Sequence, residues 1–376
     1  MIDAEVLLKE FSKLGSGLIT GVPDSLLSKL SACTEVKKFI PHIITANEGN
    51  AIGLALGEYL VSQNPAVVYM QNSGLGNTVN PLASLMDEDV YSIPVFLVIG
   101  WRGEPGVKDE PQHVKQGKIT LGQLELLGIP YRIIGQEDSE NTVLENVKTL
   151  WSLMLNKSKP VALVVRKGAI TGNWKLEPDQ FCAHFKREHA IETVLKQIPR
   201  NSFVVATTGK TGRELYELRE QRGEPHHDFL TVGGMGHASS IAYGVARKTK
   251  KTVVCLDGDG AALMHLGALG IIGNSGIKNF LHLIFNNRAH ESVGGQPTVA
   301  GNINFELISK ALGYEKFAKV EDEAELISAI EDFKSSPSLT LIEVVLQQGS
   351  RENLGRPKSS PVENKLEVIS FLNDGN

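Results

Sequence analysis

The chain has 376 residues, 41% of them hydrophobic and 22% charged, with a formal net charge of −5. These values exclude disordered and fibrous proteins, argue against a nucleic-acid partner, and suit a globular chain of two domains. Three cysteines without paired or metal-type spacing and a start without a basic flank or apolar run lead us to expect a cytoplasmic protein with no membrane contact.

The first half predicts an alternation of strands and helices. Helical periodicity covers Asn47 to Val61 and Glu140 to Met154. The expected strands are Gly17 to Val22, Ala66 to Gln71, Pro94 to Ile99, Tyr131 to Ile134 and Val161 to Arg166. Alternation of this kind predicts right-handed crossovers and a doubly wound, mostly parallel sheet.

A glutamate lies at the start of the predicted helix from Asn47 to Val61. Glu48 precedes a run of small and apolar residues, and glycines at 49, 53 and 57 allow close helix–helix approach. An acidic residue is favoured at a helix start by the macrodipole alone. A buried carboxylate is costly without a partner, however, and burial raises its pKa.

Two other stretches of the first half carry titratable groups. Asp24 follows the first strand within Gly21-Val22-Pro23-Asp24-Ser25, where it could also serve as a helix N-cap. A long polar loop begins at Trp101-Arg102-Gly103 and leads to Asp109-Glu110-Pro111-Gln112-His113. Loops of this length at strand ends are usually functional, and the intrinsic pKa of histidine suits proton transfer. A solvated loop histidine is the alternative for His113.

The segment from 171 to 186 is polar and broken by glycine and proline, so we assign it as a linker. It separates a first domain, residues 1–170, from a second domain, residues 187–376. The second domain opens with a helix from Arg187 to Gln197. Its predicted strands are Ser202 to Ala206, Thr252 to Leu256, Phe280 to Phe285 and Ser338 to Val345.

The most informative motif lies in this second domain. Leu256-Asp257-Gly258-Asp259-Gly260 ends one buried strand, and Phe285-Asn286-Asn287 ends the next. Side chains that leave neighbouring parallel strands converge at the carboxyl edge of a sheet. Asp259, Asn287 and the backbone carbonyl of Ala289 offer the oxygen ligands that Mg²⁺ prefers, while Gly258 and Gly260 admit a diphosphate. We therefore predict a metal–diphosphate site.

Two turns of the second domain could add contacts to the diphosphate. Thr208 and Gly209 lie between a strand and a helix, although plain turn chemistry would explain them equally well. Gly233-Gly234-Met235-Gly236-His237 places three glycines before a helix start, which favours anions. We expect Gly236 and His237 to belong to this cradle. Met235 could instead fill the hydrophobic core, which is a common role of methionine.

The Gly-Asp-Gly to Asn-Asn unit resembles the cofactor signature of thiamin-diphosphate enzymes. That resemblance makes residues 1–170 a pyrimidine-binding domain and residues 187–376 a diphosphate-binding domain. It places Glu48 against the aminopyrimidine ring and Met235 beneath the cofactor. It also implies a homodimer or higher assembly, in which Glu48 of one subunit and Asp259 of another serve one site.

Over nearly its full length the chain is similar to the phosphonopyruvate decarboxylase family. The similarity is carried by the runs quoted above, by Gln71-Asn72-Ser73-Gly74-Leu75-Gly76-Asn77, and by Ala289-His290-Glu291-Ser292-Val293-Gly294-Gly295-Gln296-Pro297-Thr298. It implies conversion of 3-phosphonopyruvate to phosphonoacetaldehyde and CO₂ in phosphonate biosynthesis. Catalytic roles follow for Glu48, Asp24 and His113.

A 2-oxo acid with a second anionic group needs cations or neutral donors in its pocket. Ser73, Gly74 and the turn at Gly294-Gly295-Gln296 could supply neutral donors, and we also expect Ser73 to contact the cofactor. The basic residues near the motifs are Arg102, Lys108, Lys115, Lys210 and Arg288, and the sequence does not choose among them.

Three alternative functions agree with the pattern to different degrees. Sulfopyruvate decarboxylase has the same parts. A non-catalytic thiamin-diphosphate-binding module would share the fold, but the intact Glu48, Asp24 and His113 argue against it. A Rossmann oxidoreductase would need Gly-x-Gly-x-x-Gly after an early strand, and the sequence has no such pairing with an acidic strand end.

Overall fold

The computed structural model describes residues 1–174, 176 and 183–374. The chain divides into two compact units. Unit 1 comprises Met1–Pro178 and Ser292–Gln296, and unit 2 comprises Asp179–Glu291 and Pro297–Asn376. In the described parts of the chain, no helix is both long enough and apolar enough to cross a bilayer.

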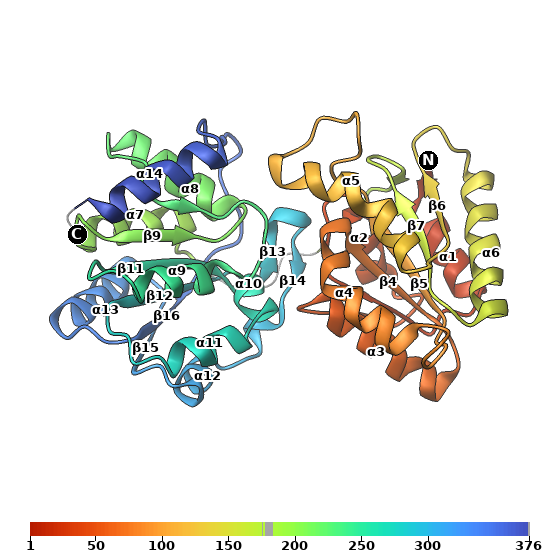
Figure 1. Ribbon diagram of the computed structural model, residues 1–376, viewed down its shortest axis with the longest axis horizontal. Coiled ribbons are helices and arrows are strands. Elements are labelled where there is room, and N and C mark those ends of the chain that lie inside the picture. Colours follow the sequence, from red (N-terminus) through yellow and green to blue (C-terminus); the bar gives the residue numbers. More distant parts are fainter. Residues whose placement is uncertain (175, 177–182, 375–376) are drawn as a thin grey trace. The chain divides into compact units, whose positions relative to one another are not determined.

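Unit 1 is built on one six-stranded parallel sheet, which Figure 1 shows between two layers of helices. Neighbouring strands pair in parallel throughout. In spatial order the strands are β3 (His42–Ile44), β2 (Leu18–Gly21), β4 (Ala66–Gln71), β5 (Val95–Gly100), β7 (Val161–Val165) and β6 (Tyr131–Ile134). A separate parallel pair joins β1 (Ile2–Asp3) to β8 (Ile170–Thr171).

Alternate residues of these strands face opposite helix layers. Val67 and Tyr69 pack with α1 (Ala4–Lys13), α2 (Ser28–Lys37) and α6 (Glu140–Lys157). Val68 and Met70 pack on the other face with α3 (Glu48–Ser62), the π-helix η2 (Leu82–Met86) and α5 (Pro111–Leu126). The 3-10 helix η1 (Asn72–Gly74) and α4 (Leu75–Pro81) lead from β4 into η2. Two hydrophobic cores therefore cover the sheet, as a run of apolar strand residues predicts.

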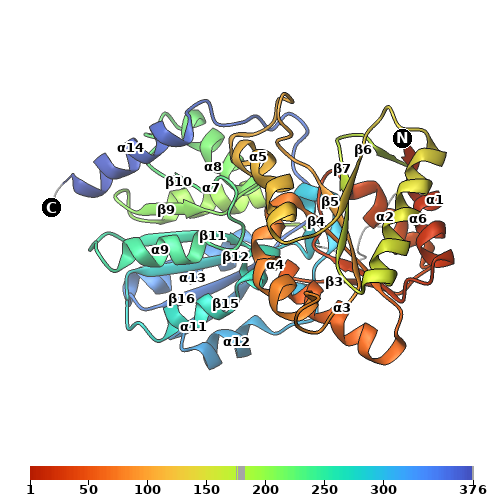
Figure 2. The ribbon, with the colours of Figure 1, turned by 45° about the vertical axis from the view of Figure 1, so that its right-hand side comes forward.

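Unit 2 repeats the same architecture (Figure 2). Its six parallel strands are, in spatial order, β10 (Phe229–Leu230), β9 (Phe203–Ala206), β11 (Val253–Gly258), β12 (Phe280–Asn286), β16 (Thr340–Val345) and β15 (Lys316–Val320). If the six strands of each sheet are numbered in chain order, both sheets read 2-1-3-4-6-5. The shared order makes the strand ends of the two units directly comparable.

Helices cover both faces of this second sheet. One core contains α7 (Arg187–Gln197), α8 (Lys210–Gln221) and α13 (Glu323–Ser335). The other contains residues of α9 (Ala238–Ala246), α11 (Gly267–Gly273), α12 (Phe305–Leu312) and α14 (Pro361–Asn373). The shorter elements are α10 (Asp259–Met264), β13 (Ala289–His290), η3 (Glu291–Val293), β14 (Gln296–Pro297) and η4 (Val299–Gly301).

The predicted fold class is confirmed: both units are doubly wound α/β layers on parallel sheets. Sequence patterns missed the edge strands β3, β10 and β15, which are short or carry lysines. Residues 175 and 177–182 of the predicted linker lie outside the described residues. The α5 helix begins at Pro111, so His113 lies in a helical first turn, whereas a loop was predicted there.

Candidate active site

The predicted site residues follow equivalent strands in the two units. In unit 1, Asp24 follows β2, Ser73 follows β4 and Arg102 follows β5. In unit 2, Thr208, Asp259 and Asn287 follow β9, β11 and β12. These are the first, third and fourth strands of each sheet, whose order reverses beside the first strand. Open α/β sheets bind ligands at the carboxyl ends of strands near such a reversal.

Glu48 is buried at the first position of α3, with only 5% of its surface exposed. Asn77 of α4 donates a hydrogen bond from Nδ2 to Glu48 Oε2 at 2.7 Å. The carboxylate passes so close to Gly74 that an added Cβ would lie 2.5 Å from Oε1. Burial raises the pKa of Glu48, although the Asn77 hydrogen bond opposes the effect. The group is thus inclined to keep or share a proton.

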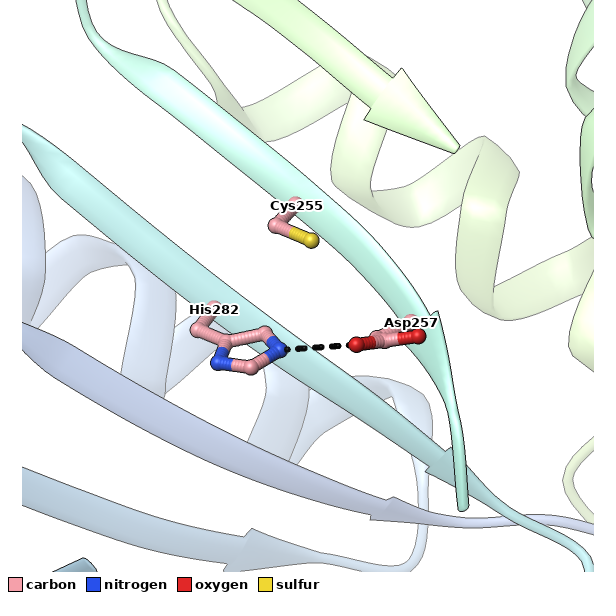
Figure 3. Close-up of side chains that lie close together, drawn as sticks. All are labelled: Cys255, Asp257 and His282. Atoms are coloured by element: carbon pink, nitrogen blue, oxygen red, sulfur yellow. Dashed lines mark hydrogen bonds and ion pairs between the residues drawn. The ribbon is translucent and has the colours of Figure 1, made fainter. Parts of the chain in front are cut away.

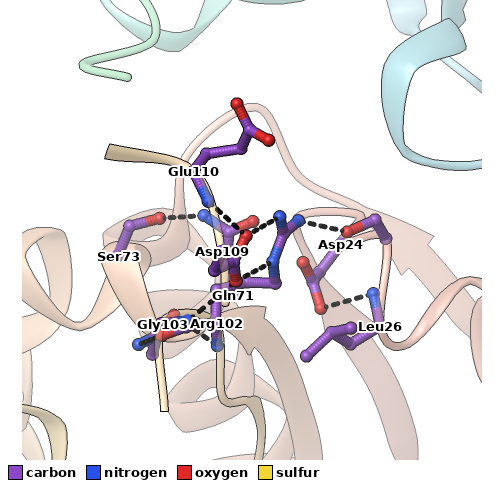
Figure 4. Close-up of polar contacts among 10 residues, drawn as sticks. Asp24, Leu26, Gln71, Ser73, Arg102, Gly103, Asp109 and Glu110 are labelled. Atoms are coloured by element: carbon purple, nitrogen blue, oxygen red, sulfur yellow. Dashed lines mark hydrogen bonds and ion pairs between the residues drawn. The ribbon is translucent and has the colours of Figure 1, made fainter. Parts of the chain in front are cut away.

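Asp24 is completely buried beside the end of β5. Its Oδ2 accepts a hydrogen bond from the Leu26 backbone N–H at 3.0 Å, while Oδ1 has no partner among the described residues (Figure 4). A side chain at Gly100 would collide with this carboxyl. Burial raises the pKa of Asp24 to about 6, against the opposing charge of Arg102. The N-cap alternative fails, because the next helix starts at Ser28 with Leu27 as its cap.

Arg102 is held in place by a fork of hydrogen bonds (Figure 4). Its Nε and Nη2 donate to the two oxygens of Asp109 at 2.8 and 2.5 Å, and its Nη1 donates to Ser25 Oγ at 2.8 Å. The backbone of Arg102 is clamped by the buried amide of Asn72, which contacts both its N–H and its carbonyl. A guanidinium carries five N–H groups, so two remain for other partners.

His113 is also buried, and its Nδ1 has no hydrogen-bond partner among the described residues. Burial lowers its pKa to about 4, and the charge of Arg102 acts in the same direction. The imidazole is therefore neutral near pH 7. Its helix packs tightly on the loop after β5, because a Cβ at Gly103 or at Gly117 would collide with backbone of the other segment. Burial removes the alternative of a solvated loop histidine.

Asp259 in unit 2 is a buried carboxylate at the start of α10. Thr298 Oγ1 donates to its Oδ2 at 2.6 Å. Burial raises its pKa to about 6, although hydrogen bonds from Thr298 and from backbone N–H groups, including that of Arg288, lower it. The contribution of Arg288 shows that Asp259 reaches the Asn-Asn turn. A carboxylate this poorly solvated gains from a neighbouring cation.

Asn287 is fixed at both ends of its amide. Its Nδ2 donates to Glu291 Oε2 at 2.8 Å, and its Oδ1 accepts from the Ala289 backbone N–H at 3.1 Å. The oxygen keeps a second lone pair. Asp259 and Asn287 leave adjacent parallel strands, and Gly258 at the end of β11 pairs with Phe285, one residue before the end of β12. This oxygen-rich donor set fits Mg²⁺.

The predicted diphosphate cradles come together in unit 2. The Gly233 backbone N–H donates to Thr208 Oγ1 at 3.2 Å, which ties the turn after β9 to the glycine loop. Gly209 (φ +102), Gly233 (φ +73) and Gly236 (φ +84) adopt backbone conformations that favour glycine. A Cβ at Gly260 would lie 3.4 Å from Met235 Cε, so the methionine reaches the Asp259 turn.

The backbone at Gly258 is not crowded by neighbouring side chains. A Cβ at Gly258 would approach only the methyl group of Thr207, at 3.9 Å, and the buried Thr207 hydroxyl has no partner among the described residues. The exposed His237 contacts the carbonyls of Gly234 and Met235 through Nδ1. These features fit a diphosphate group bound by backbone N–H groups at the starts of α8 and α9.

The five candidate basic residues fall into different environments. Arg102 is paired with Asp109, and Lys210 donates to Glu291 Oε1 at 2.8 Å. Lys108 and Lys115 are exposed, and neither forms an ion pair within the described chain. Arg288 adopts a left-handed backbone conformation, with φ +58.

Sequence reasoning missed the partners that hold the site residues. Asn77 holds Glu48, Asn72 holds Arg102, Thr298 holds Asp259 and Glu291 holds Asn287. The available signal was that a buried carboxylate or amide needs a hydrogen-bonding partner. All four lie within runs that carried the family resemblance, but spacing alone does not say which residue meets which.

A further polar group lies inside the sheet of unit 2 (Figure 3). The ligand atoms of Cys255, Asp257 and His282 lie within 4.8 Å of one another, and all three side chains are buried. His282 Nε2 lies 3.4 Å from Asp257 Oδ2, and its Nδ1 lies 3.0 Å from the Tyr314 hydroxyl. Because these contacts satisfy the ring nitrogens, we assign the group to holding β11 against β12.

Comparison with known proteins identifies two domains and several relatives. Residues 3–125 match the N-terminal TPP binding domain of thiamine pyrophosphate enzymes, and residues 207–344 match the C-terminal one. The chain is 32% identical to a phosphonopyruvate decarboxylase from Streptomyces viridochromogenes, over 99% of this chain and 95% of the relative. Identity is also 32% to a phosphonopyruvate decarboxylase from Streptomyces hygroscopicus, over 96% and 92%. A sulfopyruvate decarboxylase from Methanosarcina acetivorans is 30% identical, over 86% of each chain.

Proposed function

The chain belongs to the thiamine pyrophosphate enzymes and is a carboxy-lyase, and we propose that it converts 3-phosphonopyruvate to phosphonoacetaldehyde and CO₂. The observation that carries the proposal is a group in unit 1 that combines the buried Asp24 and His113 with the half-buried pair of Arg102 and Asp109. It combines two titratable groups that have unpartnered atoms with a fixed cation, as a doubly anionic 2-oxo acid requires.

The cofactor would be held by unit 2. We propose that Mg²⁺ binds Asp259 and Asn287 together with the Ala289 carbonyl, and that Thr208, Gly209, Gly236 and His237 contact the diphosphate. Support comes from the oxygen donors at adjacent strand ends and from the glycine-lined space beside Gly258. When bound, thiamin diphosphate supplies a carbon nucleophile and a sink for the electron pair that CO₂ leaves behind.

Glu48 would manage the proton that activates the cofactor. Because its pKa is raised, the carboxyl group of Glu48 could donate a proton to a ring nitrogen of the cofactor and accept it again. The Asn77 hydrogen bond holds one carboxyl oxygen, which leaves the other oxygen, Oε1, for that exchange. Gly74 provides the space in which the carboxylate lies.

Asp24 and His113 would exchange protons with the substrate and product. A pKa of about 6 leaves Asp24 able to exist in both protonation states near neutral pH. His113 is neutral at that pH, so its unpartnered Nδ1 can donate or accept according to the tautomer. We propose that the free N–H groups of Arg102 bind the second anionic group of the substrate, while Asp109 and Ser25 fix the guanidinium.

Sulfopyruvate is the second candidate substrate. The similarity to the sulfopyruvate decarboxylase from Methanosarcina acetivorans covers 86% of each chain, so it extends into both domains of this protein. A sulfonate and a phosphonate place anionic oxygens at the same distance from the ketone, so the described contacts suit both. The phosphonate carries more charge near neutral pH, which favours it beside a guanidinium.

A coupled assay tests this proposal. Aldehyde formed from each acid is reduced with NADH by an added dehydrogenase, with and without thiamin diphosphate and Mg²⁺. We expect turnover that requires both additions and a higher kcat/KM for 3-phosphonopyruvate. Glu48→Gln should fold normally and lose activity by about two to four orders of magnitude. Decarboxylation by Glu48→Gln at the parental rate would contradict the assignment of Glu48.

We also propose a homodimer or a multiple of it. Glu48 of one subunit and Asp259 of the other would serve the same cofactor, as the family resemblance implies. A cytoplasmic location remains a prediction.

A further inference from the structure

A network of charged side chains, most of them buried, contacts the side chain of Asn287 through Glu291. Glu291 Oε2 accepts hydrogen bonds from Asn287 Nδ2 and from Arg187 Nη1, both at 2.8 Å. Its Oε1 accepts from Lys210 Nζ at 2.8 Å. Arg187 also donates two hydrogen bonds to the Glu214 carboxylate, from Nε at 2.7 Å and from Nη2 at 2.9 Å. The side chains of Arg187, Glu214 and Glu291 are only 8%, 2% and 12% exposed.

The contacts of Asn287 distinguish its oxygen from its nitrogen. In the observed orientation, the nitrogen donates to the Glu291 carboxylate and the oxygen accepts from the Ala289 N–H. A flipped amide would place its oxygen against the carboxylate and its N–H groups against another N–H. Both contacts would be repulsive, so Glu291 excludes the flipped state. Only the oxygen end of an amide can coordinate a cation.

Glu291 can perform this role because it cannot move away. Two cations hold its two oxygens, and one of these cations is fixed by Glu214. Lys210 lies in the first turn of α8, where a positive charge is unfavourable unless a carboxylate is beside it. The carboxylate therefore stabilises α8 and orients Asn287 at the same time.

We propose that Glu291 is a positioning residue for the metal site, because it fixes the Asn287 amide with its oxygen available to a divalent cation. The inference rests on the proposed function, in which Asp259 and Asn287 hold Mg²⁺. Outer-shell partners of this kind typically change metal affinity by 10- to 100-fold.

The test measures Mn²⁺, a spectroscopic substitute for Mg²⁺, by the loss of its free-ion electron paramagnetic resonance signal in the presence of thiamin diphosphate. We expect Glu291→Gln to bind Mn²⁺ about tenfold or more weakly than the parent. The matched control is Glu343→Gln. Glu343 is buried and accepts a hydrogen bond from Asn286 Nδ2 at 2.7 Å, one residue from Asn287, so its substitution should leave Mn²⁺ affinity unchanged.

A double variant separates positioning from general loss of structure. In Asn287→Asp with Glu291→Gln, the hydrogen bond is reversed, the net charge is kept and a carboxylate oxygen faces the cation. We expect its Mn²⁺ affinity to return to within a few-fold of the parent, although the contacts of Glu291 with Arg187 and Lys210 are altered as in the single variant. If Glu291→Gln does not fold, Glu291→Asp keeps the charge and withdraws it from Asn287, with the same expected weakening.

The outcomes distinguish the two proposals. Parental Mn²⁺ affinity in the folded Glu291 variants, or equal weakening by Glu343→Gln, overturns the positioning role and leaves the metal site standing. Failure of the double variant to recover binding also overturns it. If the parent does not bind Mn²⁺ with thiamin diphosphate, or if Asp259→Ala binds it as well as the parent, the proposed metal site itself is wrong.

Discussion

Three carboxyl groups at the strand ends are buried and keep raised pKa values: Asp24, Glu48 and Asp259. When such a buried carboxyl group ionises, its charge needs a neighbouring cation or hydrogen-bond donor. The burial of Glu48 follows from the apolar composition of its helix, so the sequence predicts it. Asn77 could not be predicted as its partner, because that contact depends on how α3 packs against α4.

The raised pKa of Asp24 makes a prediction about stability that does not involve activity. The pKa rises from 3.8 to about 6 on folding, so the folded state binds a proton that the unfolded state has released. The contribution of Asp24 to the free energy of unfolding is therefore greatest below pH 3.8 and is lost as the pH rises from 3.8 through 6. Asp24→Asn does not titrate, and its advantage over the parent should grow by about 2 kcal/mol between pH 4.5 and 7.5.

Chemical denaturation of the two proteins at both pH values measures this difference. Using the same two pH values for both proteins cancels the contributions of all other titrating groups. A difference in the free energy of unfolding that does not change with pH would show that Asp24 ionises in the folded protein as it does in the unfolded chain.

At the scale of elements, the region after β5 shows why a loop was predicted where a helix begins. The stretch from Trp101 to Glu110 is polar and rich in glycine, and Pro111 suits both a loop and the first turn of a helix. In the structure, α5 begins at Pro111 and packs closely against the loop at Gly103. Contact between Gly103 and Gly117 has no periodic signal in the sequence, so this docking could not be predicted.

Two glycines of α5 provide a matched pair for testing that docking. A Cβ at Gly117 would collide with the Gly103 carbonyl, whereas a Cβ at Gly122 would meet nothing within 4 Å. We expect Gly122→Ala to raise the free energy of unfolding by about 0.5–1 kcal/mol through helix propensity. Gly117→Ala should lower it and reduce kcat by tenfold or more, because the loop that carries Arg102 and the turn that carries His113 must separate.

Denaturation curves give the free energy of unfolding of the two variants, and initial rates give their kcat. If Gly117→Ala were as stable and as active as Gly122→Ala, the close packing of α5 on the loop would have no role in placing His113.

At the scale of the whole molecule, two units with the same strand order place their functional residues after equivalent strands. Strand ends can be predicted from short apolar runs, which is why Asp24, Asp259 and Asn287 were found from the sequence. Edge strands such as β10 and β15 lack such runs. The partners of the site residues come from distant segments, such as Thr298 for Asp259, and depend on the completed fold.

We propose that Glu48 of one subunit and Asp259 of another act on the same cofactor. Hybrid dimers test it most directly: Glu48→Gln and Asp259→Ala chains with different affinity tags are co-expressed, and the hybrid is isolated through both tags. Each homodimeric variant should be nearly inactive. The hybrid should recover about half of the parental decarboxylase activity, because one of its two sites is intact and the other carries both changes. A hybrid as inactive as the two homodimers would contradict the shared site.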